Sequence, residues 1–522
     1  MPKLAKFQIA LVLVAAILLG GCATLPPPVP GPPAYALTDV ADTHLGRLAA
    51  NAAPAGQGGL SGFRLLPEAA FAFDARISLA RHARKSLDVQ YYLIQNDEVG
   101  LFFLRELRDA AARGVRVRLL MDDLYTGGED ELLLALAAHP NVEVRLFNPL
   151  PSRADSPAAR VLFSLHDFSR INHRMHNKLM VADNSFAVSG GRNIASEYFM
   201  RGSAANFIDV DVLSCGPIVH GMSEAFDRYW NSEQVRPVGN VVAGAMSAEA
   251  ARGRFDALSR AALPDVPLRP RDVMGRGAVG QQLETGALEL YWATSELFVD
   301  DPRKITRGAD ARRGSVTEGA LGVLATARRD AMIASPYFIP GERGMAMMRT
   351  AMAQGGRAEI VTNSLGATDE PLVHARYARY RADMLRIGVT IREIAPTLAG
   401  KSGRFGDFGQ SISRLHAKLM VIDGQRMFIG SMNLDPRSAA VNTELGLVIN
   451  SPELVADFEK LLSSVRANTA YRLRLSPDSG HVQWLEYDAD GKDIVHDDEP
   501  GGHHWLRLQN WLLSPLVGED LL

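Results

Sequence analysis

One arrangement of chemically active residues occurs twice in this chain, about 240 residues apart. In each copy a histidine, a lysine, an aspartate, a glycine and an asparagine follow one another at identical spacing: His176, Lys178, Asp183, Gly190 and Asn193, then His416, Lys418, Asp423, Gly430 and Asn433. A histidine can attack phosphorus or transfer a proton, and lysines balance the charge of a phosphoryl group. Paired in this way, the residues suit nucleophilic chemistry on a phosphodiester.

The spacing also gives each member of the pattern a place. Histidine and lysine stand two residues apart on a strand-like apolar run, so both side chains point to one face. Asp183 and Asp423 fall where each strand must turn, and we expect them to be structural, with hydrogen bonds to nearby backbone. The two glycines permit close backbone approach, and the two asparagines can donate to a phosphate oxygen.

Two copies of the pattern predict one shared site. We expect the two halves of the chain to pack about a pseudo-twofold axis, so that both histidine–lysine pairs meet. One histidine then attacks phosphorus and becomes a phosphohistidine, while the other protonates the leaving oxygen and later deprotonates the incoming alcohol or water. The alternatives are a pair of core histidines or a metal site. Because two lysines would repel a cation, we expect no metal and no cofactor.

Strand and helix signals alternate from about residue 60 and begin again in the second half. Residues 86–94 are strand-like, and residues 100–113 follow with helical apolar spacing. Residues 331–339 match the first of these strands, with Tyr337 in the place of Tyr92. The pattern predicts an α/β fold of two similar lobes, each a mixed sheet flanked by helices, packed around one active site.

The predicted organisation has six parts. They are a lipoprotein signal peptide (1–22), a proline-rich linker (23–58), a first lobe (59–240), a connecting segment with some helix (241–285), a second lobe (286–468) and a C-terminal tail (469–522). The tail ends in tryptophans and leucines. Two interpretations stay open for it, a membrane-interfacial segment and a terminal helix packed on the body.

The first residues have the pattern of a bacterial export signal. Lys3 and Lys6 precede an apolar run over 7–19 that is too short for a membrane span, and Leu-Gly-Gly-Cys follows. This predicts that Cys22 is lipidated and becomes the new N-terminus; the alternative is an uncleaved anchor with an incidental cysteine. Ala23 stands where an aspartate would signal retention in the inner membrane. We therefore expect a lipid-anchored protein of the cell envelope, in the outer membrane facing the periplasm in a Gram-negative cell.

Composition excludes some classes of function. The formal net charge of −3 over 522 residues does not support a generally basic nucleic-acid binder, so we expect no nucleic-acid partner. The chain has two cysteines. With Cys22 acylated, no intrachain disulfide can form, and Cys215 in an apolar run is expected to be a buried small hydrophobe.

The duplicated pattern resembles that of the phospholipase D superfamily, and the resemblance spans roughly residues 60–470. It implies that the paired histidines, lysines and asparagines are catalytic. It also implies a carboxylate behind each histidine that fixes its tautomer, and Asp209 and Glu444, each eight residues before a proline, match that place. Family habit makes His176 the nucleophile and His416 the general acid and base. Ser431 of the second copy is replaced by Gly191 in the first, which removes one hydroxyl donor.

Several short segments look like the bacterial cardiolipin synthases, particularly their C type: 87–92, 121–123, 191–193, 300–304 and 433–438. The resemblance implies transfer of a phosphatidyl group from phosphatidylglycerol or phosphatidylethanolamine to a hydroxyl of phosphatidylglycerol, giving cardiolipin. A hydrolytic phospholipase D uses the same residues and remains an alternative, and an extracytoplasmic nuclease is a weaker one. An accessory protein is left open.

A few further residues are candidates for binding the substrate. Tyr92 and Tyr337 lie at matching ends of the first strand of each lobe, His374 lies on one helical face with tyrosines, and Arg437 follows the second motif. Arg437 could hold an acceptor phosphate. For His374 and its neighbours, simple packing is the competing interpretation.

Overall fold

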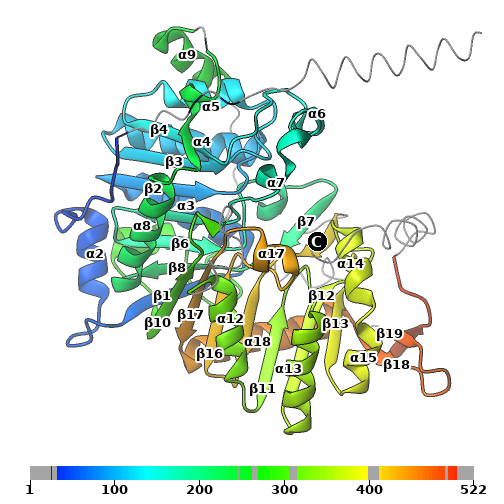
Figure 1. The fold of residues 1–522 in the computed structure, drawn as a ribbon. Coiled ribbons are helices and arrows are strands. Elements are labelled where there is room, and N and C mark those ends of the chain that lie inside the picture. The colour runs from blue at the N-terminus through cyan, green and yellow to red at the C-terminus, as the bar shows by residue number, and fades with distance from the viewer. Residues whose placement is uncertain are drawn as a thin grey trace, which may run out of the picture.

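The computed structural model describes residues 25, 27, 32–244, 246–260, 268–304, 314–397, 411–487 and 492–501. Two α/β lobes follow one another along the chain, and in Figure 1 the first lies above the second. Cys22 and the apolar C-terminal residues lie outside the described residues, as do the expectations attached to them.

The strands of the first lobe form one mixed sheet. Neighbouring strands follow the order β9 (Val235–Pro237), β4 (Val142–Phe147), β3 (Arg116–Asp122), β2 (Ser86–Tyr91), β5 (Leu179–Ala182), β6 (Phe186–Gly190), β8 (Asp211–Cys215) and β1 (Ser61–Leu66). Strands β2, β3 and β4 are parallel, and the other pairs are antiparallel.

The second lobe repeats this order strand for strand. Its sheet follows the order β18 (Ala470–Leu475), β13 (Thr390–Ile394), β12 (Arg357–Asn363), β11 (Asp330–Ala334), β15 (Leu419–Ile422), β16 (Arg426–Gly430), β17 (Leu445–Asn450) and β10 (Tyr291–Val299). The parallel strands are again three, β11, β12 and β13. The repeated order confirms the predicted fold of two similar α/β lobes.

Strand pairs also join the two lobes. Equivalent strands β1 and β10 pair antiparallel, so that within the described residues eighteen strands form one continuous sheet. A second pair, β7 (Ala205–Ile208) with β14 (Ile412–Leu415), is parallel and forms a small sheet of its own. Each of these two strands ends directly before a residue that the sequence predicts to be functional, Asp209 or His416.

Alternation along the strands divides the apolar core. In β5, Met180 and Ala182 belong to the core of the first lobe, whereas Leu179 and Val181 face a core that contains residues of both lobes. β15 behaves alike, because Met420 and Ile422 face the second lobe's own core while Leu419 and Val421 face the shared one. Successive side chains of a strand point to opposite faces, which produces this division.

Helices cover these sheets. The first lobe contributes α3 (Ala69–His82), α4 (Glu98–Ala112), α5 (Asp130–Ala137), α6 (Pro157–Leu162), α7 (Phe168–Ile171) and α8 (Pro217–Trp230), and the second α12 (Val316–Ala325), α13 (Gly341–Ala353), α14 (Pro371–Ala378), α15 (Arg381–Arg386), α17 (Pro436–Ala440) and α18 (Pro452–Thr469). Helices α8 and α18 both begin with proline, which suits the first turn, and both pack in the shared core. Short 3-10 turns lie at Leu165–Asp167, Ser196–Phe199 and Val238–Asn240.

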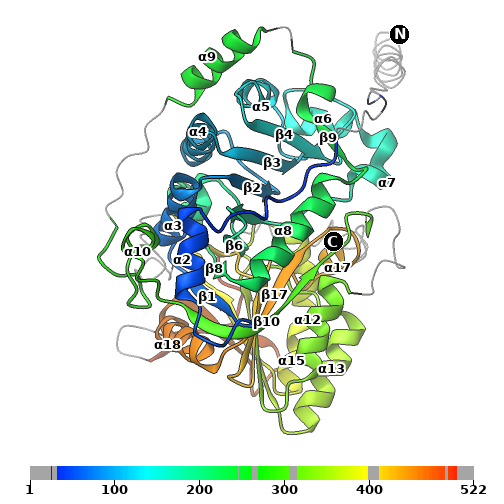
Figure 2. The ribbon, with the colours of Figure 1, turned by 90° about the vertical axis from the view of Figure 1, so that its left-hand side faces the viewer.

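The segments outside the two lobes are more integrated than expected. The backbone amide of Ala36 donates to Asp227 of α8, and that of Ala34 donates to Asn231, directly after α8. Helix α2 (His44–Ala52) follows, so this part of the linker lies along the first lobe (Figure 2). The connecting segment holds helices α9 (Ala248–Leu258) and α10 (Val279–Thr285).

The expected tail also begins inside the fold. Strand β18 pairs with β13, as β9 does with β4, and the strands β19 (Val482–Tyr487) and β20 (Asp493–His496) extend the same edge.

In the part of the chain that the structure describes, no helix has the length and apolar character needed to cross a membrane.

Candidate active site

The histidines and lysines directly precede equivalent strands. His176 and Lys178 stand before β5, and His416 and Lys418 before β15, all of them buried. Between the members of each pair, the intervening residue points elsewhere: Ala417 lies in the shared core. The pair therefore projects as the two-residue spacing predicts, although strands β5 and β15 begin only after each lysine, at Leu179 and Leu419.

Each histidine contacts a carboxylate of the opposite lobe. His176 Nδ1 lies 3.0 Å from Glu444 Oε2, and His416 Nδ1 lies 2.7 Å from Asp209 Oδ2. Both carboxylates are completely buried. A hydrogen bond from Nδ1–H to the carboxylate fixes the tautomer and leaves Nε2 free for chemistry. Because each histidine takes its carboxylate partner from the other lobe, both lobes contribute residues to the site.

Backbone hydrogen bonds between the lobes produce this exchange. The amide of His176 donates to Thr443 O (2.8 Å), one residue before Glu444, and that of His416 donates to Ile208 O (2.8 Å), one residue before Asp209. Each histidine is thus aligned beside the opposite carboxylate by main-chain pairing that involves no special side chain.

Each histidine is preceded by a residue whose backbone amide is hydrogen-bonded to a polar side chain. That side chain stands at the end of β3 in the first lobe and at the end of β12 in the second. Asp122 Oδ2 accepts from Met175 N (2.8 Å), and Asn363 Oδ1 accepts from Leu415 N (2.7 Å). Asn363 was missed from the sequence, although its offset of 241 from Asp122 matches the repeat and could have revealed it.

Burial sets the protonation of the histidines in the free protein. Burial lowers the pKa of His176 to about 4, although Glu444 pulls it upward. Burial, followed by the charge of Lys418, holds the pKa of His416 well below its ordinary value. Both rings are therefore neutral at pH 7. An anionic phosphodiester between them would raise these pKa values, because a nearby opposite charge favours the protonated form.

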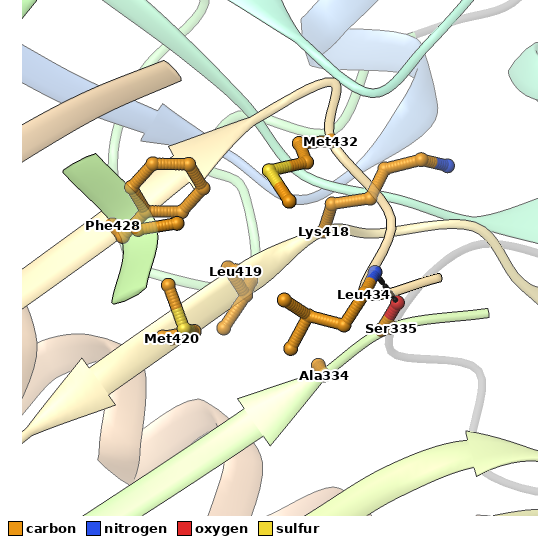
Figure 3. Close-up of a pocket in the computed structure, with 9 residues that line it drawn as sticks. Ala334, Ser335, Lys418, Leu419, Met420, Phe428, Met432 and Leu434 are labelled. Carbon is orange, nitrogen blue, oxygen red and sulfur yellow. Dashed lines mark hydrogen bonds between the residues drawn. The ribbon is translucent and has the colours of Figure 1, made fainter. Parts of the chain in front are cut away.

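The lysines are equally buried. Burial lowers the pKa of Lys178 to about 7 and that of Lys418 to about 8. Lys178 Nζ donates to His176 O (2.7 Å), and Lys418 Nζ donates to His416 O. Figure 3 shows the Lys418 ammonium pointing away from the apolar side chains of a small cavity at the base of the second motif. Each ammonium keeps two further protons for a phosphoryl group.

The two asparagines present unused polar atoms. Asn193 Nδ2 donates to Tyr198 Oη (2.9 Å). The buried Oδ1 atoms of Asn193 and Asn433 have no hydrogen-bond partner among the described residues. A buried polar atom without a partner is unfavourable and marks a place where a ligand can bind. Rotation of either amide by 180° would present Nδ2, the phosphate donor, to the same position.

The motif aspartates and glycines shape the backbone. Asp183 accepts from the amides of residues 84–86, and Asp423 accepts from those of residues 328–330, so each ties its turn to the start of the lobe's first parallel strand. A Cβ on Gly190 would collide with Asp211, and one on Gly430 with the backbone of Leu445.

The carboxylates differ in their surroundings where the sequence motif differs. Ser431 Oγ donates to Glu444 Oε2, whereas a Cβ at Gly191 would collide with the Asp209 carboxylate. Burial raises the pKa of Glu444, but His176 and Lys178 outweigh it and keep it below the ordinary value. Burial raises the pKa of Asp209, and Lys418 and Arg192 offset only part of this.

Aromatic rings flank the histidines. Tyr92 packs edge-on against His176, with ring centroids 4.9 Å apart, and Tyr198 packs edge-on against His416 at 5.0 Å. Phe207 also contacts His416. Sequence comparison of the two copies indicates Tyr92 but misses Tyr198 and Phe207, because Tyr198 has a serine, Ser438, at the matching place of the second copy.

The remaining candidates occupy different surroundings. Tyr337 is half-buried, and burial raises its pKa well above the ordinary value, with Asp369 beside it. Arg437 donates to Asn172 Oδ1 (2.8 Å) of the other lobe. His374 bonds to Glu499 (2.7 Å), which also pairs with a buried arginine, so its environment is that of a packed ionic cluster.

Asp300 supports Glu444 from behind. Its Oδ2 accepts from Glu444 N (3.0 Å) and from Lys304 Nζ (2.8 Å), and its own amide donates to Glu444 O (3.1 Å). Tyr229 of the first lobe donates to Asp300 O (2.7 Å). Asp300 and Lys304 are buried.

In the described residues, no group of three or more metal-ligating side chains is arranged to hold a metal ion.

Comparison with known proteins identifies the family. The family model described as cardiolipin synthase, PLD-like domain, matches residues 77–230 and 321–466, one match in each lobe. The chain belongs to this phospholipase D-like family. It is 38% identical to cardiolipin synthase C of Escherichia coli over 459 residues, which cover 86% of this chain and 94% of that protein. It is also 25% identical to cardiolipin synthase A of Pseudomonas fluorescens, over 77% of this chain and 67% of that protein.

A solved structure has the same fold. The phosphatidylserine synthase of Haemophilus influenzae aligns with a TM-score of 0.55 at 15% identity, over 91% of this chain and 98% of that one. These findings confirm the resemblance on which the sequence interpretation relied. The chain is a phospholipase D-type enzyme with two lobes.

Proposed function

We propose that this enzyme transfers a phosphatidyl group between phospholipids and makes cardiolipin. The donor is phosphatidylglycerol or phosphatidylethanolamine, and the acceptor is a free hydroxyl of phosphatidylglycerol. The observation that carries the proposal is the pair of buried histidines, each hydrogen-bonded to a carboxylate of the opposite lobe. Identity to a cardiolipin synthase over most of both chains supports the substrate class.

In the first step Nε2 of His176 attacks the phosphorus of the donor. The bond from phosphorus to the headgroup oxygen breaks, and His416, protonated in the presence of the anionic substrate, gives its proton to that oxygen. The two lysines and the two asparagines stabilise the charge that develops on the phosphoryl oxygens. The phosphatidyl group is now bonded to His176.

In the second step neutral His416 removes the proton of an acceptor hydroxyl, whose oxygen attacks the same phosphorus. The N–P bond breaks and His176 is restored, so atoms and protons balance over the cycle. The surroundings of Glu444 support His176 as nucleophile. An imidazole bonded to phosphorus carries positive charge, and Glu444, whose pKa is held below the ordinary value, is the better counterion of the two carboxylates.

Incubation of the protein with phosphatidylglycerol vesicles, with and without phosphatidylethanolamine, tests the proposal. We expect cardiolipin by mass spectrometry from the wild type, and none from His176→Ala or His416→Ala. Phosphatidic acid alone would identify a hydrolytic phospholipase D instead, in which water is the acceptor. Turnover of nucleic acid without lipid turnover would move the function to a nuclease.

A lipid anchor on Cys22 would keep the enzyme at its substrate. The proposal is that Cys22 is acylated and that the protein resides in the cell envelope, facing the periplasm in a Gram-negative cell. Metabolic labelling with a fatty acid tests it. Label in the wild type and none in Cys22→Ala is the expected result, and equal label in both would refute it.

A further inference from the structure

Large apolar side chains are exposed together on one short stretch of the first lobe. Leu162, Phe163, Leu165 and Phe168 are 59, 37, 46 and 48% exposed, and all four lie within seven residues. Other exposed large apolar residues in the described chain are scattered, apart from Ile494 and Val495 on β20. Single exposed apolar residues are ordinary, whereas a contiguous group marks a contact surface.

This apolar strip is joined to the loop that carries a further exposed ring. Arg160 of α6 donates to Thr126 Oγ1 (2.8 Å), and the neighbouring Tyr125 is 46% exposed. Tyr125 packs edge-on against Tyr92 at 5.3 Å, and Tyr92 in turn packs against His176. A chain of aromatic contacts therefore runs from Tyr125, exposed on the loop to which α6 is bonded, to the proposed nucleophile.

The strip also meets the second lobe beside the site. Directly after α7, Asn172 accepts the hydrogen bond from Arg437 of α17, and four residues later the chain reaches His176. Apolar side chains, a guanidinium and the histidines thus follow one another from the surface inward. A phospholipid has its acyl chains at one end and its phosphodiester toward the other, so a lipid whose phosphorus reaches the histidines can leave its acyl chains beside the apolar strip.

We propose that residues 157–171, with Tyr125, form the surface by which this enzyme docks on a phospholipid bilayer. The inference rests on the proposed function, because it takes the substrate to be a membrane lipid. The side chains project from three short helical turns and form no long helix face on which a partner helix could pack. A lipid surface needs no such shape complementarity, and apolar rings gain free energy at its headgroup boundary.

The test measures depth in the bilayer and needs no catalysis. Phe168→Cys and, as the matched control, Ile494→Cys are each labelled in the full chain with an environment-sensitive fluorophore, and the unsubstituted chain gives the background from Cys22 and Cys215. Vesicles of phosphatidylglycerol and phosphatidylethanolamine carry nitroxide-labelled lipids. An acylated Cys22 takes no label and holds both variants on the vesicle alike, so the comparison reports which surface faces the lipid: we expect strong quenching at position 168 and little at 494. Equal quenching at both positions, or none at 168, would overturn the proposal and favour a second copy or another part of this chain as the partner.

A second measurement uses turnover. Replacing Leu162 and Phe168 together by serine should lower the rate on vesicles relative to that on short-chain monomeric phosphatidylglycerol by at least about tenfold. Ile494→Ser is the matched control and should leave that ratio unchanged. An unchanged ratio in the double variant would overturn the docking surface. Quenching at position 168 in a protein that makes no cardiolipin would instead keep the surface and refute the proposed function.

Discussion

At the scale of residues, the site depends on two histidines that are neutral because they are buried. The unfolded chain binds a proton on each histidine below about pH 6.5, whereas His176 in the folded protein remains neutral down to about pH 4. Unfolding therefore takes up protons in this window, and stability falls as the pH is lowered from about 6.5 to about 4. Above this window the contribution no longer changes with pH.

The depressed pKa of His176 should therefore cause a pH-dependent loss of stability. At pH 5 the depressed pKa of His176 costs about 2 kcal/mol of unfolding free energy relative to pH 7.5. Urea unfolding at the two pH values, in wild type and His176→Gln, measures it. The variant should lose less stability on acidification. An identical loss in both proteins would mean that His176 is not the group that titrates.

The unequal carboxylates lead to a prediction about rate. Glu444→Gln removes the counterion of the proposed nucleophile and should lower kcat on the order of a thousandfold, whereas Ser431→Ala removes one hydrogen bond to it and should lower kcat about tenfold. Steady-state kinetics on phosphatidylglycerol vesicles gives both values. Equal small effects would show that Glu444 does not serve the reacting histidine.

The motif residues can be located from the sequence because their spacing is local, and their catalytic roles are proposals. The two histidine–lysine pairs follow from their identical spacing alone, whereas Asp209 and Glu444 follow from the family resemblance together with their matching distance from a proline. What the spacing does not contain is the register between lobes, and so neither the exchange of carboxylates nor Tyr198 follows from it. The exchange arises from backbone pairing of residue 176 with 443 and of 416 with 208.

At the scale of elements, the end of β10 supports the start of β17. Asp300 is hydrogen-bonded to the backbone amide and to the backbone carbonyl of Glu444, and its carboxylate pairs with the buried Lys304. Asp300→Asn should lower kcat at least about tenfold with little change in KM, because it displaces the carboxylate that we propose acts in the chemical step. It should also lower Tm, because a buried cation loses its partner. Asp301→Asn, at a half-buried neighbour that does not contact Glu444 in the described structure, is the control. A lower Tm with normal kcat would assign Asp300 a structural role alone.

Element boundaries were predicted less well than element types. The alternation of strands and helices indicates both lobes, since buried strands and amphipathic helices have distinct periods. The tail was separated from the second lobe because its strand signals are scattered, yet β18 completes that sheet as β9 completes the first. The proline-rich composition conceals α2, and it also conceals the hydrogen bonds of Ala34 and Ala36 at the end of α8, because long-range hydrogen bonds such as that of Ala36 to Asp227 leave no local pattern.

At the scale of the whole molecule, the lobes form one structural unit. The β1–β10 pair continues the sheet across the boundary, and buried residues of both lobes share one apolar core. We therefore predict a single calorimetric unfolding transition. Leu447→Ala, in the shared core, should lower the unfolding free energy by about 2–5 kcal/mol and keep the transition single. Two separate transitions would contradict this view of the lobes.

The most direct test of the account is to identify the histidine that carries the intermediate. The protein is mixed with phosphatidylglycerol, quenched within one turnover in base, since phosphohistidines are acid-labile, and digested for mass spectrometry. The account predicts a phosphatidyl group on the peptide that contains His176, and its loss in His176→Asn. A phosphatidyl group on His416, or one that persists in His176→Asn, would contradict it.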